Sequence, residues 1–282
     1  LIFSPERVLT DRVFADLRKY PKLVGGLSPE GAMRGVAFYQ QVLQVDERPD
    51  LPRGNGVWDL GSAEASELAK LAETTYRDVN IGLANQFATF AAEHGIDVYQ
   101  VIEASNSQPY SHIHRPGIAV GGHCIPVYPR LYLFNDPAAT VVRAARAANA
   151  AMPSYAVGLA AGAYGDLAGA RVAVLGAAYR GGVKETAFSG VFATVDALRA
   201  AGATVLVHDP MYTDEEIAHF GWAPYHLGDA ADVAILQADH DEYRSLAAAD
   251  LPGVSVIVDG RAILDADAFP GVDVRVIGRA VR

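Results

Sequence analysis

The residues of this chain best suited to chemistry are residues 121–126, which read Gly-Gly-His-Cys-Ile-Pro and contain the only cysteine among 282 residues, Cys124. A single cysteine cannot form a disulfide within the chain, so its thiol serves either packing or reactivity. A lone cysteine is more often a packed side chain. Two glycines beside it, however, let the backbone pass close to a bulky group while presenting sulfur to that group. Both interpretations stay open on these residues alone.

A long helix is predicted upstream of the cysteine. Residues 62–94 contain no proline and one glycine, and Gly95 supplies a helix stop. A helix of this length would span roughly 50 Å, which exceeds a small domain, so we expect it to bridge two domains and to pack against a partner chain. One face of the predicted helix carries a stripe of apolar residues at three- and four-residue steps, namely Leu68, Leu71, Ala72, Tyr76, Val79, Leu83, Phe87 and Phe90. Lys70 falls on the opposite face, and on periodicity alone it is a solvated charge.

The last third of the chain has a different pattern, in which apolar runs alternate with helices. This predicts an α/β fold, a doubly wound parallel sheet with helices on both faces. Such sheets bind ligands at the carboxyl ends of their strands, which here carry Tyr179, Arg180, Asp209 and Arg261. Residues 176–182 do not form the dinucleotide fingerprint G-x-G-x-x-G. Arginines at two strand ends indicate phosphate or another anion, and the alternative is a sheet with surface arginines. The predicted strands are 172–175, 204–207, 233–236, 254–258 and 274–277.

Shorter elements are predicted from breaks and caps. Ser28 as N-cap and Pro29 at the first position open a helix. The Gly-, Pro- and His-rich residues 110–124 are expected to form a loop too polar to be core. An Ala-rich helix is expected to be interrupted near Pro153. The predicted elements are a strand end at 1–3, helices over 8–20 and 29–43, a strand at 23–24, and helices over 96–106, 137–162 and 188–201.

Composition narrows the class of protein. The net charge of −10 argues against nucleic acid as a partner, since no basic stripe matches phosphates. No apolar run reaches the roughly 18–20 residues of a membrane span. One cysteine fits a reducing cytoplasm. The chain starts at Leu1 without methionine or signal peptide, so we expect it to be the back part of a longer protein.

Four blocks of this sequence, in order and spacing, resemble the nucleotide-sugar 6-dehydrogenases, the UDP-glucose and UDP-N-acetylmannosaminuronate dehydrogenase family. They are residues 4–9, residues 66–73 with 77–80, residues 121–126, and residues 172–179 with 207–210. The resemblance implies that residues 1–57 are the tail of an NAD-binding Rossmann domain whose glycine-rich loop lies upstream of Leu1. It further implies a central helical domain at 58–165 that forms a homodimer through the long helix, and a Rossmann-like nucleotide-sugar domain at 166–282.

The resemblance also implies an activity, the NAD-dependent four-electron oxidation of a sugar C6 alcohol to a carboxylate. Cys124 would form a thiohemiacetal and then a thioester, Lys70 would stabilise oxyanions, and Glu6 would act as acid and base in thioester hydrolysis. No metal site is predicted. The implied substrate-binding residues are Val8, Leu9, Tyr110, Gly121, Gly122, Tyr179, Arg180 and Arg261, and the implied cofactor-binding residues are Glu6, Cys124 and Lys184.

Several positions depart from the family pattern. Tyr128 stands where an aspartate is usual, Thr74 where an asparagine is usual, and Ala187 and Tyr110 where arginines are usual. The resemblance still implies that Thr74 and Tyr128 occupy catalytic positions. Tyrosine is not an anionic base at neutral pH. These departures motivate an alternative function, a catalytically impaired homologue that binds a nucleotide-sugar. An epimerase or reductase is a weaker alternative, because the chain lacks the expected Ser/Tyr-Lys pair after a G-x-G-x-x-G strand.

The substrate stays open at this point. UDP-glucose is the default, and UDP-N-acetylmannosamine, UDP-N-acetylglucosamine, GDP-mannose and a TDP-sugar are alternatives. The block around His123 and Cys124 resembles the N-acetylhexosamine branch of the family.

Overall fold

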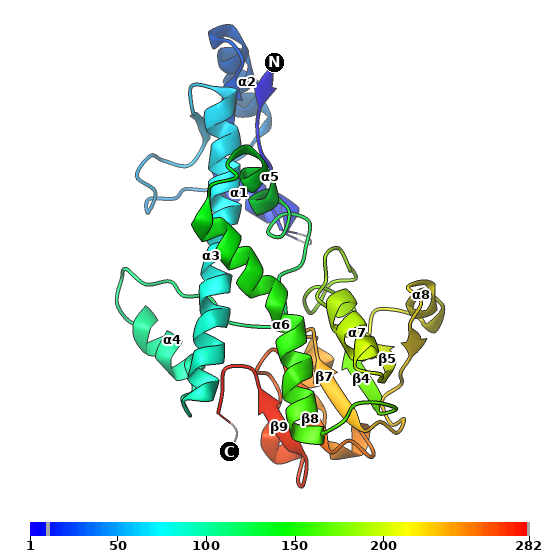
Figure 1. Ribbon diagram of the computed structural model, residues 1–282. Coiled ribbons are helices and arrows are strands. Elements are labelled where there is room, and N and C mark those ends of the chain that lie inside the picture. The colour runs from blue at the N-terminus through cyan, green and yellow to red at the C-terminus, as the bar shows by residue number, and fades with distance from the viewer. Residues whose placement is uncertain (10–11, 281–282) are drawn as a thin grey trace. The chain divides into compact units, whose positions relative to one another are not determined.

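The computed structural model of the protein describes residues 1–9 and 12–280 and divides the chain into two compact units, residues 1–74 and 75–282 (Figure 1). The boundary falls within one helix, α3 (Ala63–Glu93), which confirms the helix predicted over 62–94. Gly95 follows it with a φ of 76°, a backbone conformation that favours glycine. The three-part division at residues 57 and 165 remains a prediction.

The first unit has a three-stranded sheet with the order β1-β2-β3. Strand β1 (Ile2–Phe3) is antiparallel to β2 (Lys22–Gly26), and β2 is parallel to β3 (Val57–Asp59). The helix predicted over 8–20 is shorter, α1 (Val13–Lys19), and residues 10 and 11 lie outside the described residues. Leu9 precedes this helix, and its N–H donates to the carboxylate of the buried Asp16 at 3.0 Å instead of to a helix carbonyl.

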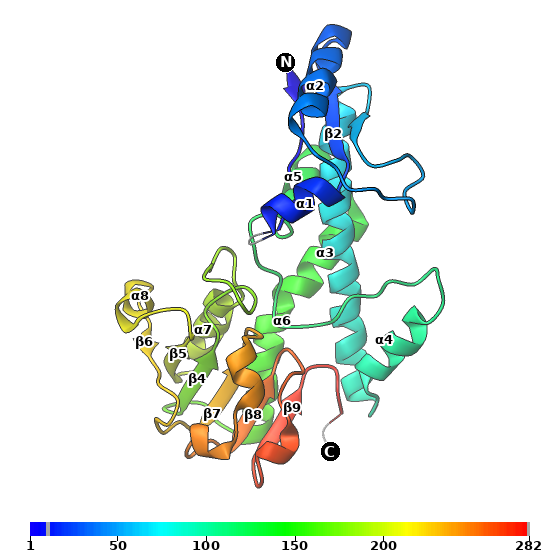
Figure 2. The same ribbon diagram turned by 180° about the vertical axis from the view of Figure 1, so that it is seen from behind.

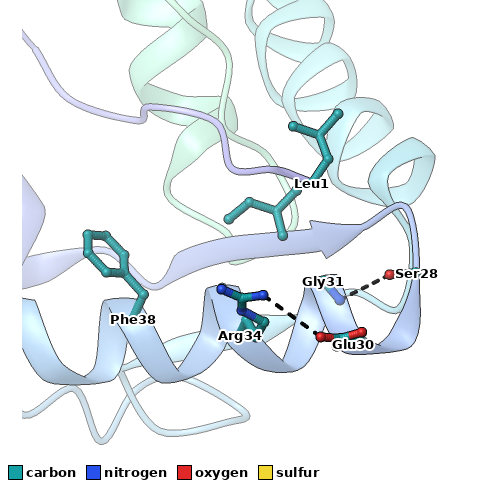
Figure 3. A pocket seen from close by; sticks show the side chains of 8 residues that line it. Leu1, Ser28, Glu30, Gly31, Arg34 and Phe38 are labelled. Atoms are coloured by element: carbon teal, nitrogen blue, oxygen red, sulfur yellow. Dashed lines mark hydrogen bonds and ion pairs between the residues drawn. The ribbon is translucent and has the colours of Figure 1, made fainter.

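The predicted cap of the next helix is confirmed. The Ser28 hydroxyl accepts from the Gly31 N–H at 3.1 Å, and Pro29 opens α2 (Pro29–Val42). Figure 3 shows this cap in a surface pocket of about 370 Å³ beside β1 and α2, together with the ion pair between Glu30 and Arg34. The site residues predicted in this unit, all of them described, are not among the residues that line this pocket.

The second unit is built on a six-stranded parallel sheet, which confirms the predicted α/β fold. Its order is β6-β5-β4-β7-β8-β9, so the strand order reverses between β4 and β7. In sheets of this kind the ligand crevice lies at that reversal, outside the carboxyl ends of the strands. The strands are β4 (Arg171–Leu175), β5 (Thr204–His208), β6 (Ala223–Pro224), β7 (Val233–Leu236), β8 (Val256–Asp259) and β9 (Asp273–Val276).

Two hydrophobic clusters cover the two faces of this sheet, because successive residues of each strand point to opposite sides. Helices α6 (Thr140–Tyr164) and α7 (Val191–Ala200) pack on the face seen in Figure 1. The opposite face, seen in Figure 2, is covered by short 3-10 helices and turns instead of long helices, with Tyr243 and Phe269 in the cluster. The 3-10 helices are η1 (Asp241–Ser245), η2 (Ala248–Asp250) and η3 (Ala266–Ala268).

The structure corrects two expectations in this unit. Helix α6 continues through Pro153, and burial of this proline offsets the hydrogen bond that its missing N–H costs the helix. The loop between residues 110 and 124 is partly core, because Ile118 is fully buried. Helix α4 (Val98–Asn106) agrees with the sequence, whereas α5 (Tyr128–Asn135) and α8 (Asp214–His219) were not predicted.

Within the described ranges, 1–9 and 12–280, no helix is both long and apolar enough to cross a bilayer. The same part of the chain shows no cluster of three or more His, Cys, Asp and Glu side chains that could hold a metal ion.

Candidate active site

Cys124 is exposed and lies in a tight turn of the second unit. Its carbonyl oxygen accepts from the N–H of Val127 at 3.1 Å and of Tyr128 at 2.9 Å, which starts α5 directly after the turn. An exposed thiol on a hydrogen-bonded turn is available to an electrophile, which distinguishes it from a packed cysteine. The geometry therefore favours reactivity over packing for Cys124.

The two glycines before the cysteine pack tightly, and the group they approach is part of the protein. A Cβ at Gly121 would collide with the Cβ of Tyr179 and lie 3.0 Å from the carbonyl oxygen of Phe188. Gly122 has a φ of 92° and faces the Tyr179 ring, and its N–H donates to the carbonyl oxygen of Ala187 at 2.8 Å. The cysteine turn is thus fixed to the loop that follows β4.

A second contact joins the same two segments. Nε2 of His123 lies 2.9 Å from Oε2 of Glu185. The hydrogen bond with His123, and next the one from the Ala187 N–H, lower the pKa of Glu185 and so keep its carboxylate ionised. His123 and Glu185 therefore add a charge-dependent link to the backbone contact at Gly122.

Tyr128 lies within electrostatic reach of Cys124. Burial first, and then the negative charge of the Cys124 thiolate, raise the pKa of Tyr128. The phenol is therefore neutral at pH 7 and can donate a hydrogen bond but cannot serve as an anionic base.

Amide side chains hold the segment that leads to the cysteine. Asn80 of α3 accepts from the His114 N–H at 2.9 Å and donates to the His112 carbonyl at 2.7 Å. The buried Asn85, also on α3, accepts from the Gly117 N–H at 2.9 Å. Gln237, which follows β7 and is fully buried, donates to the carbonyl oxygen of Ile118 at 3.0 Å. These amides fix the backbone across the carboxyl end of the sheet.

Arg261 extends from the loop after β8 towards the β4–β7 reversal. Its Nε donates to the Gln237 carbonyl at 2.8 Å and its Nη2 to the Tyr179 carbonyl at 3.4 Å. Burial lowers the pKa of Arg261, opposed by the charge of Asp239, but a guanidinium stays protonated in proteins. Gly117 admits the guanidinium, because a Cβ there would lie 2.9 Å from Nη1. This cation can therefore meet an anion at the ligand edge of the sheet.

The loop that carries Arg261 is shaped by Asp259, the last residue of β8. Its buried carboxylate accepts four backbone N–H groups at 2.8–2.9 Å, from Arg261, Ala262, Ile263 and Leu264. Burial nevertheless raises the pKa of Asp259. Ala262 has a φ of 54°, an unfavourable conformation for a non-glycine residue that these bonds hold in place.

In dinucleotide-binding sheets the turn after the first strand binds a diphosphate through its backbone N–H groups. Here the N–H groups of the turn after β4 already donate to side chains of the protein. Those of Ala177 and Ala178 donate to Asp209, that of Gly181 to Asp239, and that of Gly182 to His240. Burial alone would raise the pKa of Asp209, but the bond from His240 and backbone N–H groups outweigh it and lower the pKa. This turn therefore does not fit the diphosphate of a dinucleotide, in agreement with its missing fingerprint.

The remaining site residues predicted in this unit are Arg180, Lys184 and Tyr110. Arg180 donates to its neighbour Gly181 and stands over the Tyr179 ring at 5.9 Å. Lys184 pairs with Glu216 at 2.6 Å, so a role at NAD would require this pair to open. Tyr110 is 92% exposed.

In the first unit, Lys70 and Glu6 come together. Lys70 is buried and its ammonium donates to the backbone carbonyl of Glu6 at 2.7 Å, so its interpretation as a solvated charge was wrong. The Glu6 carboxylate pairs at 2.5 Å with Lys22, a buried residue of β2 that the sequence did not single out. Lys22 also faces the Tyr39 ring at 4.9 Å. Two lysines thus hold the strand-end segment that carries Glu6.

Thr74, Val8 and Leu9 complete the predicted residues of this unit. The buried Thr74 hydroxyl donates to helix carbonyls of Lys70 at 2.8 Å and of Leu71 at 3.2 Å, and so serves its own helix. Val8 is partly buried and Leu9 is 44% exposed. Their backbone lies beside that of Glu6.

Comparison with known proteins assigns the family. Residues 64–151 match the central domain of the UDP-glucose/GDP-mannose dehydrogenase family, and residues 173–266 match its UDP binding domain. The UDP-N-acetyl-D-mannosamine dehydrogenase of Pyrococcus horikoshii is 34% identical over 272 residues, 93% of this chain and 60% of that protein. The chain therefore spans about three-fifths of the length of this relative.

Solved structures agree with the sequence comparison. The UDP-D-ManNAc dehydrogenase structure from Pyrococcus horikoshii superposes with a TM-score of 0.82 at 32% identity, over 99% of this chain and 64% of that one. An NDP-N-acetyl-D-galactosaminuronic acid dehydrogenase from Methanosarcina mazei Go1 gives a TM-score of 0.80 at 27% identity, over 99% and 62%. With both characteristic domains present in order, the chain belongs to the UDP-glucose/GDP-mannose dehydrogenase family.

Proposed function

We propose that the protein is an NAD-dependent nucleotide-sugar 6-dehydrogenase that oxidises a C6 alcohol to a carboxylate through Cys124. One observation carries the proposal: Gly121 and Gly122 pack on Tyr179, whose carbonyl accepts from Arg261. The turn that presents the thiol is thereby fixed to the sheet edge where a nucleotide would bind.

Arg261 and Arg180 are the residues we propose for the nucleotide diphosphate. Guanidinium groups suit phosphate because their planar N–H groups match two oxygens at once. Because the backbone N–H groups of the β4 turn already bind Asp209 and Asp239, the phosphates would depend on these side chains.

The proposed chemistry has four steps: a first oxidation, addition of the thiolate, a second oxidation and hydrolysis. The C6 alcohol loses a hydride and a proton and becomes an aldehyde. The Cys124 thiolate then adds to the aldehyde carbon, forming a C–S bond and a thiohemiacetal, which loses a second hydride to become a thioester. Water finally cleaves the C–S bond and releases the carboxylate and the thiol. NAD, when bound, supplies the acceptor for both hydrides.

Side chains of the first unit have proposed roles in these steps. The Lys70 ammonium would stabilise the oxygen anion of the adduct, an electrostatic effect that is strong in a buried site. Glu6, ion-paired with Lys22, would accept the proton of the attacking water as an ionised base. The neutral Tyr128 would donate a hydrogen bond beside Cys124.

The proposed substrate is UDP-N-acetyl-D-mannosamine, ahead of the UDP-glucose default. The Pyrococcus horikoshii relative that supports this choice carries that activity in its name. The test is kcat/KM for UDP-N-acetyl-D-mannosamine, UDP-N-acetyl-D-glucosamine and UDP-glucose, measured with the full-length protein and NAD. We expect kcat/KM for UDP-N-acetyl-D-mannosamine to exceed that for UDP-glucose by at least about tenfold. A site that hydrogen-bonds an acetamido group leaves its own polar groups unpaired when the sugar lacks that group. A preference for UDP-glucose would contradict the substrate assignment and leave the reaction class standing.

The protein is further proposed to form a homodimer through α3. Apolar side chains stay exposed along this helix, among them Leu83, Phe87 and Phe90. Phe87 and Phe90 also line a largely apolar groove of about 650 Å³ beside α4. Exposed apolar patches of this kind mark interaction sites, and a second α3 offers a matching apolar stripe. Light scattering should give a dimer, and Phe87→Glu should give a monomer.

Two findings favour the second candidate, a nucleotide-sugar-binding homologue with impaired oxidation. Tyr128 is neutral where the family pattern has an aspartate, and the Thr74 hydroxyl is bonded to its own helix. This candidate predicts tight UDP-sugar binding without turnover of any of the three sugars.

A further inference from the structure

Arg261 contacts two of the residues that hold the cysteine segment, Gln237 and Tyr179. Its guanidinium donates to the backbone carbonyls of Gln237 and Tyr179. The Gln237 side chain donates to Ile118, and the Tyr179 side chain packs on Gly121. A single cation therefore contacts two anchors of the segment that ends in the cysteine turn, Gln237 and Tyr179.

Gln237 is the more rigid of these two anchors. Its side chain is fully buried, its Oε1 accepts from the Thr194 hydroxyl at 3.0 Å, and its Nε2 donates to Ile118 at 3.0 Å. Gly190 lies against the amide, where a Cβ would come within 2.7 Å of Nε2. With both polar atoms bonded and no room to turn, the amide must move together with its backbone.

The segment beyond Ile118 has little freedom to absorb such a movement. Ala119 has a φ of 63°, an unfavourable conformation that its neighbours hold in place. Gly121 then meets Tyr179, and the Gly122 N–H donates to Ala187. A displacement at Ile118 would therefore reach Cys124 through a short, fixed stretch of backbone.

We propose that Gln237 is a positioning residue that couples a nucleotide diphosphate at Arg261 to the placement of Cys124. The inference rests on the proposed function, since it takes Arg261 as a diphosphate ligand. Hydrogen bonds from a guanidinium to phosphate are stronger than those to a neutral carbonyl. Because the guanidinium is planar and rigid, turning it towards phosphate changes both carbonyl contacts together, and the Gln237 amide passes the change to Ile118.

The experiment uses the full-length protein, UDP as the probe, and iodoacetamide to measure the alkylation rate of Cys124 by mass spectrometry of its peptide. UDP affinity is measured in parallel by calorimetry. Gln237→Met keeps the length of the side chain and removes its hydrogen bonds to Ile118 and Thr194. Gln237→Glu keeps the acceptor for the Thr194 hydroxyl but loses the N–H donor to Ile118, and it replaces Gln237→Met in the experiment if that variant does not fold. Asn80→Ala is the matched control, because it removes a carboxamide that holds the same segment without contacting Arg261.

In the wild-type protein we expect UDP to change the Cys124 alkylation rate by about fivefold or more, within the usual range of coupling between sites. The Gln237→Met variant should have a Kd for UDP within about threefold of the wild-type value, and its Cys124 alkylation rate should no longer change with UDP. The Asn80→Ala variant should have a different alkylation rate without UDP but should still respond to UDP. An equal response in wild type and Gln237→Met would mean that UDP shields the thiol directly and would overturn the proposal. The proposal would also be overturned if UDP bound the wild-type protein without changing the Cys124 alkylation rate. Failure of UDP to bind the wild-type protein would instead contradict the proposed function from which the inference starts.

Discussion

Nε2 of His123 lies 2.9 Å from Oε2 of Glu185, which ties the residue before Cys124 to the loop after β4. Both side chains are substantially exposed, so the pair is expected to contribute little to global stability. Its position matters more than its strength, because it adjoins the Gly122 contact that fixes the cysteine turn.

The first prediction concerns the pH dependence of this link. The folded-state pKa of Glu185 is lowered, so its ionised form stabilises the fold above the unfolded value of about 4.3, and this contribution disappears as pH falls through the folded pKa. Glu185→Gln should therefore have a lower Tm than wild type near pH 6, and the two should converge towards about pH 3. Glu103→Gln, at an exposed site on α4, is the control and should follow the wild type throughout. A Tm difference that grows on acidification would refute the assignment.

The second prediction concerns Gly121. Alanine there would press on Tyr179 and on the Phe188 carbonyl, so Gly121→Ala should reduce the free energy of unfolding by about 1–3 kcal/mol. Gly158→Ala on α6, where a Cβ meets open space, should instead be neutral or stabilise by up to about 1 kcal/mol. Urea denaturation followed by circular dichroism compares the two. Equal stability of the two variants would show that the cysteine turn is not tightly packed.

The third prediction concerns a buried ion pair between α3 and α6. Arg146 of α6 donates to Asp78 of α3 at 2.5 Å, and burial raises the pKa of Asp78. Arg146→Met leaves a buried carboxylate without its cation and should cost about 3–5 kcal/mol. Adding Asp78→Asn should recover most of that loss, because the amide carries no charge. A double-mutant cycle in urea measures this coupling. Additive effects of the two changes would mean that the pair contributes nothing as a pair.

The fourth prediction separates catalysis from nucleotide binding. Lys70→Met should lower kcat by about 10²–10³-fold and leave the Kd for UDP unchanged, because the ammonium is proposed to act on the oxyanion only. Arg261→Met should weaken the binding of UDP by about 10–100-fold, the usual loss for hydrogen bonds to a charged group. Steady-state kinetics and calorimetry give the two quantities. Loss of UDP affinity in Lys70→Met would contradict the division of roles.

Much of the fold could be predicted from the sequence, because strong periodic signals coincide with caps and stops. The buried strands, the α3 helix and the Ser28 cap all follow from such local signals. Predictions were wrong where tertiary packing overrides local preference. Pro153 continues a helix because its ring is buried, and Ile118 is core because the sheet edge covers it.

The site was predictable only in part. Cys124 and Arg261 stand out by residue type and by position in their motifs, and the structure places their segments against the same edge. Gln237 and Asn85 were missed, although Gln237 is a polar residue directly after a buried strand, a position that often faces a ligand. Their role depends on contacts between residues far apart in sequence, 119 positions for Gln237 and Ile118, and local patterns carry no such information.

Oxidation through a Cys124 thioester is tested by the number of NADH molecules formed per UDP-N-acetyl-D-mannosamine consumed by the full-length protein. We predict two NADH per sugar in the wild type, and in Cys124→Ala no more than one, with the aldehyde as product. Two NADH per sugar in Cys124→Ala would contradict the thioester route through Cys124, and so would a wild-type reaction that stops at one NADH with free aldehyde.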